Sequence, residues 1–161
     1  MPEMTLLGWF HTILGVLAVL SGFYTLYKYR VISYDVSSGK LYILVTLLVA
    51  GSALGIYNQG GFGVAHILAV LTLIALAGGY IMERYKWFGS FSKYFQALGY
   101  TSTLLFHMLP AITDFLRRLP VGDTFIDSFE DPLLMNFHLA FLIIYLVGIV
   151  LQMVWLKRSQ V

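Results

Sequence analysis

Three long stretches without a charged residue constrain the fold of this chain more than any other feature. These uncharged runs extend from Met4 to Tyr27, from Leu41 to Met82 and from Pro132 to Leu156. An α-helix needs about 20 apolar residues to cross the hydrocarbon core of a bilayer. The first and last runs therefore predict one crossing each, and the middle run is long enough for two. The sequence Asn-Gln-Gly-Gly at 58–61 favours a turn that divides the middle run.

A further apolar segment near residues 94–116 completes a predicted all-α fold, an integral membrane helical bundle with five transmembrane helices in one domain. With 59% hydrophobic and 11% charged residues, the chain is far from a soluble protein in composition. Its first apolar run is full length and lacks a basic start, so we expect a retained helix and not a cleaved signal peptide. The predicted helices cover about 5–27, 41–57, 62–82, 94–118 and 132–156 within the single domain 1–161.

The basic residues predict how the helices are oriented. Three Lys or Arg residues fall between the first two predicted helices, three between the third and fourth, and two after the last, whereas only Arg117 and Arg118 lie between the fourth and fifth. Cytoplasmic loops of membrane proteins carry the excess of Lys and Arg. We therefore expect the N-terminus outside, the C-terminus in the cytoplasm, and a location in a bacterial inner membrane.

The predicted fourth helix carries a polar stripe within an otherwise apolar sequence. At about 100° per residue, its polar residues fall within roughly 40° of one line along the helix. A stripe of this kind is expected to face other helices and not lipid. Its members are Tyr100, Thr103, His107, Asp114 and Arg118.

The chain has four histidines, and each falls in a different predicted helix. With the N-terminus outside, His11, His66 and His138 lie one to two turns below the outer surface, and His107 lies deeper in the same half. Ionisable groups inside a bilayer are costly and point to a function by default. The alternative is that each histidine only forms hydrogen bonds between helices.

The first functional hypothesis is one b-type haem for membrane electron transfer, held by two of the histidines His11, His66, His107 and His138. Arg117 or Arg118 would pair with the haem propionates, and glycines on the first helix would make room for the ring. Asp114 would accept a hydrogen bond from an imidazole or, with the remaining histidines, line a quinol pocket. This hypothesis implies a quinone or another redox partner at the outer face.

The second hypothesis is a non-haem metal enzyme, with His11, His66, His138 and Asp114 around zinc, iron or copper. The chain has no cysteine, so thiolate metal sites and disulfides are excluded. The third hypothesis is a structural subunit without a cofactor, in a homo-oligomer or a larger membrane complex. All three hypotheses imply the lipid bilayer as a partner, and none of them involves nucleic acid.

The first half of the chain resembles a family of small bacterial multi-pass membrane proteins of unknown function. His11, Gly15, Gly22, Arg30 and the sequence Gly-Lys-Leu-Tyr at 39–42 carry this resemblance. Family members carry further histidines at positions where this chain has Ser-Ser at 37–38 and Glu-Arg-Tyr-Lys-Trp at 83–87. The resemblance implies the multi-pass architecture and no assigned activity. The chain is more loosely similar to the membrane subunits of b-type cytochromes, but without their paired histidines on one helix.

Overall fold

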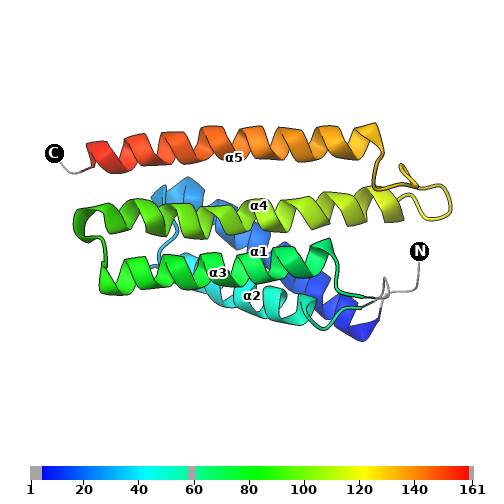
Figure 1. The fold of residues 1–161 in the computed structure, drawn as a ribbon, viewed down its shortest axis with the longest axis horizontal. Coiled ribbons are helices and arrows are strands. Elements are labelled where there is room, and N and C mark those ends of the chain that lie inside the picture. The colour runs from blue at the N-terminus through cyan, green and yellow to red at the C-terminus, as the bar shows by residue number, and fades with distance from the viewer. Residues whose placement is uncertain (1–4, 58–60, 160–161) are drawn as a thin grey trace.

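The computed structural model describes residues 5–57 and 61–159, and this part of the chain is built from helices without a strand (Figure 1). The elements in chain order are α1 (Leu6–Tyr29), α2 (Ser37–Ala53), α3 (Val64–Tyr85), the short 3₁₀ helix η1 (Gly89–Phe91), α4 (Ser92–Arg118) and α5 (Pro132–Arg158). The all-α class and the number of long helices are as predicted from the sequence. Of the predicted turn at 58–61, residues 58–60 lie outside the described part of the chain, and Gly61 forms a bend.

The largest difference from the predicted bounds is in α2, which begins at Ser37 and ends at Ala53, not at 41 and 57. The sequence Ser-Ser-Gly-Lys at 37–40 forms its first turn, which the uncharged run that begins at Leu41 does not include. At the other end, Leu54 and Gly55 already form a turn.

Three helices, α1, α3 and α5, are long and apolar enough to cross a membrane. The apolar helix α2 has 17 residues and extends over about 25 Å at 1.5 Å per residue. The helix α4 is longer, with 27 residues, but it carries the polar stripe. These lengths and compositions are those of an integral membrane protein.

The helices α1 to α4 form a bundle in which α2 contacts α1 and α3, and α4 contacts α3 and α1. The last helix, α5, packs against α4 at the edge of this bundle (Figure 1). Its buried residues follow one narrow stripe, and most of its other side chains are exposed apolar groups. The buried stripe of α5 consists of Leu134, Ile149, Gln152 and Leu156.

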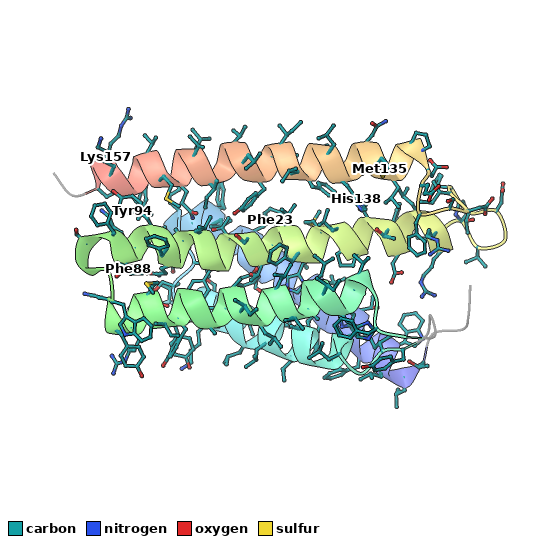
Figure 2. The ribbon with its side chains drawn as sticks, in the orientation of Figure 1. Phe23, Phe88, Tyr94, Met135, His138 and Lys157 are labelled. Atoms are coloured by element: carbon teal, nitrogen blue, oxygen red, sulfur yellow. The ribbon has the colours of Figure 1, made fainter. Side chains whose placement is uncertain are left out.

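The long helices alternate in direction, and the residues at the two ends of the bundle differ in chemistry. The N-terminal ends of α1, α3 and α5 meet the C-terminal ends of α2 and α4 at what we name the histidine end, on the right in Figure 1. Figure 2 shows His138 and Met135 there, and Lys157 and Tyr94 at the opposite, basic end. The basic end carries Lys28, Arg30, Lys40, Arg84, Lys86, Lys93, Lys157 and Arg158.

Close helix packing around two buried tyrosines forms the core of the bundle. Tyr42 of α2 and Tyr100 of α4 are both fully buried. A Cβ atom at Gly22 of α1 would lie 2.8 Å from the Tyr42 ring, so the glycine is needed for α1 to approach α2. A Cβ atom at Gly79 of α3 would likewise lie 2.7 Å from the Tyr100 ring, so this glycine lets α3 approach α4.

Candidate functional site

The polar stripe of α4 faces the bundle along its first half, as the sequence predicted. Tyr100, Thr103 and His107 are buried. The hydroxyl of Thr103 bonds to the hydroxyl of Tyr42 on α2 and donates to the Tyr100 carbonyl at 2.7 Å. The stripe therefore joins α4 to α2 through hydrogen bonds in a region from which lipid is excluded.

His11 bonds to the side of α2 that faces α1. Its Nδ1 atom lies 3.1 Å from the Val49 carbonyl oxygen and 3.0 Å from the Ser52 hydroxyl. A carbonyl only accepts, so Nδ1 carries the proton and Nε2 has the free lone pair. The Ser52 hydroxyl donates to the same carbonyl at 2.9 Å. The imidazole N–H is thus shared between two oxygens that are already bonded to each other.

His107 bonds to α2 as well, from the other side of the bundle. Its Nε2 atom lies 3.1 Å from the Thr46 hydroxyl, and its ring meets the Tyr42 ring edge to face at 6.4 Å between centroids. His11 and His107 therefore both bond to residues of α2.

His66 caps its own helix. The backbone N–H of Gly63 donates to Nδ1 of His66 at 3.1 Å, which leaves the proton of a neutral imidazole on Nε2. The ring is held between Tyr57 and Phe62, with centroid distances of 4.6 and 5.0 Å. His66 is 4% exposed, and its Nε2 atom has no hydrogen-bond partner among the described residues.

His138 joins α5 to α4 with the arrangement seen at His11. Its Nε2 atom lies 3.1 Å from the Thr113 hydroxyl and 3.3 Å from the Leu109 carbonyl oxygen. The Thr113 hydroxyl itself donates to that carbonyl at 2.8 Å. The imidazole N–H again bonds to a hydroxyl–carbonyl pair on a neighbouring helix.

The two arginines proposed as an anion clamp have partners within the protein. Arg118 lies 3.7 Å from the Asp114 carboxylate one turn before it on α4. The Arg117 guanidinium stacks over the Phe129 ring at 3.8 Å. At 55% exposure of its side chain, Asp114 lies at the surface of the histidine end and not in the interior.

In residues 5–57 and 61–159, no three His, Asp or Glu side chains gather closely enough to hold a metal ion. His11, His66 and His138, which we expected together around a metal with Asp114, instead bond to three different partners. His11 bonds to α2, His138 bonds to α4, and His66 caps α3. The shared depth predicted for these residues does not bring them into one cluster.

Glu83, at the end of α3, is the polar centre that sequence reasoning missed. Its Oε1 atom accepts hydrogen bonds from the Ser33 hydroxyl and, at 2.8 Å, from the backbone N–H of Tyr34. Its Oε2 atom accepts one from the Tyr100 hydroxyl at 2.9 Å. One carboxylate therefore joins α3, α4 and the turn between α1 and α2. In the sequence, Glu83 is only the first charged residue after a long apolar run.

Two glutamines complete the hydrogen bonding of that turn. The side-chain amide of Gln96 donates to the Ile32 carbonyl at 3.1 Å, and that of Gln152 donates to the Arg30 carbonyl at 2.7 Å. Gln152 also accepts a bond from Thr101 at 3.0 Å. Arg30 ends α1 in the left-handed conformation, with φ of 66°, which aims its carbonyl away from the helix.

Comparisons of the chain with protein-family models, curated proteins and solved structures gave no match. The family resemblance suggested by the first half of the sequence therefore stays a prediction. The arrangement of the side chains is the remaining guide to function.

Proposed function

We propose that this protein is an integral membrane protein with five transmembrane helices that acts as a structural subunit of a membrane complex, without a cofactor. The observation that carries the proposal is that each histidine forms a hydrogen bond within the protein. Three of them join two different helices, and the fourth caps α3. Polar side chains between membrane helices commonly have this role.

The geometry at His11 and His138 supports a structural role in particular. In both cases the imidazole bonds to a carbonyl and to a hydroxyl that already donates to that carbonyl. Such a contact gives the imidazole N–H a partner that it would lack in lipid. It fixes how α1 lies on α2 and how α5 lies on α4.

A single b-type haem is a second proposal, supported by one observation. The Nδ1 atom of His11 is fixed by a backbone carbonyl and its Nε2 atom is free, as in many metal ligands. The other histidines do not supply a matching second ligand. The Nε2 atom of His107 bonds to Thr46. The Nε2 atom of His138 bonds to Thr113 and Leu109. In His66, Nε2 carries the proton. The described histidines therefore supply one axial ligand for a haem, on His11.

Replacing His107 with alanine tests the structural proposal. We expect the free energy of unfolding to fall by about 2 kcal/mol, because the change leaves a cavity and removes the partner of a buried hydroxyl. Thermal unfolding of the detergent-purified protein measures this loss. Asparagine at the same position, which keeps a polar group near Thr46, should recover part of it.

Absorption spectra and metal analysis of the same samples provide the second readout. For the structural proposal, wild type and variant should both lack a Soret band and stoichiometric metal. A Soret band in wild type that disappears in the His11→Ala variant would instead establish haem binding. Metal in stoichiometric amount would instead support the hypothesis of a non-haem metal enzyme.

The charge of the two ends supports the orientation with the N-terminus outside. The basic end has two acidic residues among the described ones, Asp35 and Glu83, whereas the loop at 119–131 at the histidine end is acidic. Because Lys and Arg concentrate in cytoplasmic loops, we expect the basic end to lie in the cytoplasm.

Cysteine labelling tests this orientation cleanly, because the chain has no cysteine of its own. In intact cells, we expect a membrane-impermeant maleimide to label Asp123→Cys and to miss Lys40→Cys and Lys86→Cys. The latter two should react only after the membrane is opened. Labelling of the Lys40 and Lys86 positions in intact cells would reverse the proposed topology.

A further inference from the structure

A shallow apolar groove lies on the outer surface of α3 and α4. It has a volume of about 340 Å³, and its walls include Leu71, Ile74, Met82, Phe95 and Phe106. Gly78 lies in this groove, and a Cβ atom there would have no neighbour within 4 Å. The space is therefore open to whatever molecule lies beside these helices in the membrane.

A second cavity, of about 330 Å³, lies at the basic end of the same two helices. Met82 lines both cavities, so the second adjoins the first. The second cavity is polar, in contrast to the groove. Its walls include Glu83, Lys86, Ser90, Ser92, Lys93 and Gln96.

The charges around the polar cavity favour an anion. Lys86 is exposed and forms no ion pair with any residue in the described ranges. The Lys93 ammonium donates one hydrogen bond, to the Leu156 carbonyl at 2.8 Å, and lies 4.9 Å from the centre of the Tyr94 ring. Its two further N–H donors form no hydrogen bond with the described residues. Glu83 is the one acid in the wall, and both of its oxygens already accept hydrogen bonds from the protein.

We propose that the two cavities together bind one anionic phospholipid, with its phosphate beside Lys86 and Lys93 and an acyl chain in the groove. Leu71 and Met82 are separated by about 16 Å along α3, given a rise of 1.5 Å per residue. One leaflet of the hydrocarbon core is about 15 Å thick. The groove therefore spans the depth of an acyl chain, and the basic cavity lies at the depth of a headgroup.

Native mass spectrometry of the full chain in mild detergent tests this site, with phosphatidylglycerol and phosphatidylcholine as probes. We expect wild type to prefer phosphatidylglycerol. The double variant Lys86→Gln/Lys93→Gln should bind it about 25-fold more weakly, from about fivefold for each lysine. The matched control Lys28→Gln/Lys157→Gln removes two charges at the same end but outside the cavity, and it should bind as wild type does.

A second pair of variants tests the groove without changing charge. Gly78→Leu should fill it and weaken binding of both lipids, whereas Gly148→Leu, at a similarly open position on α5, should not. The proposal would be overturned if the variants and their controls lost lipid binding to the same extent. It would also be overturned if wild type bound the two lipids equally. Displacement of the lipid by millimolar inorganic phosphate, or a dimer in wild type that Gly78→Leu dissociates, would also overturn it.

Discussion

Replacing Glu83 with alanine is expected to lower the free energy of unfolding by about 3 kcal/mol. The change removes an acceptor that bonds to the Ser33 hydroxyl, the Tyr34 N–H and the Tyr100 hydroxyl. Hydrogen bonds to a charged group each contribute roughly 1.5–3 kcal/mol, and water that reaches the half-buried site should replace some of this. Thermal unfolding followed by circular dichroism in detergent measures the loss.

Two further variants separate this effect from a general loss of charge. Glu83→Gln keeps an acceptor oxygen, so its stability should lie between those of wild type and Glu83→Ala. Glu130→Ala removes an acid from the exposed loop at the histidine end, and it should change stability by less than about 0.5 kcal/mol. If Glu83→Ala were as stable as Glu130→Ala, the carboxylate would not hold the three segments together.

The helices could be predicted from the sequence because lipid selects for uniform apolar runs. A charge-free stretch of sufficient length predicts a helix regardless of its partners, and all five predicted helices are present within residues 5–57 and 61–159. The start of α2 was predicted too late because Ser37 and Lys40 are polar. An apolar scan detects the hydrocarbon core and not the helical turns that extend into the headgroup region.

The candidate site was predicted less completely, because hydrogen bonding depends on directions that spacing does not encode. Helical periodicity was sufficient to place Tyr100, Thr103 and His107 on the buried face of α4. It could not show that His11 bonds to the Val49 carbonyl, because a backbone group leaves no signature in the sequence. The same limit applies to Glu83, because two of its donors, on Ser33 and Tyr34, lie about 50 residues earlier in the chain.

The glycines also show that contacts between helices cannot be predicted from spacing in the sequence. The sequence predicts that the glycines of the first helix form a groove for a neighbouring helix or, under the haem hypothesis, for the ring. In the structure Gly22 contacts the Tyr42 ring, whereas Gly15 has open space beside it. The groove that we infer for a lipid instead lies between α3 and α4, where a Cβ atom at Gly99 would meet the backbone of Gly79 at 3.0 Å. A glycine permits close approach, but only the fold decides which surface approaches it.

Replacing Gly39 with alanine is expected to cost about 2–3 kcal/mol of stability, although alanine favours a helix over glycine by about 1 kcal/mol. Gly39 is buried in the first turn of α2, and a Cβ atom there would overlap the Ser33 carbonyl oxygen. The turn between α1 and α2 must then move. Because the Ser33 hydroxyl is one of the donors to Glu83, the same displacement should weaken the hydrogen bonds of the carboxylate. Thermal unfolding measures the loss.

Gly51→Ala is the matched control, because Gly51 lies on the same helix with nothing within 4 Å of its added Cβ. It should leave stability unchanged or raise it slightly. The double variant Gly39→Ala/Glu83→Ala provides the sharper test. If both changes act on the same turn, their combined loss should fall short of the sum by about 1 kcal/mol, as is typical for residues that share partners. Full additivity would mean that the close packing at Gly39 and the carboxylate of Glu83 stabilise the bundle independently.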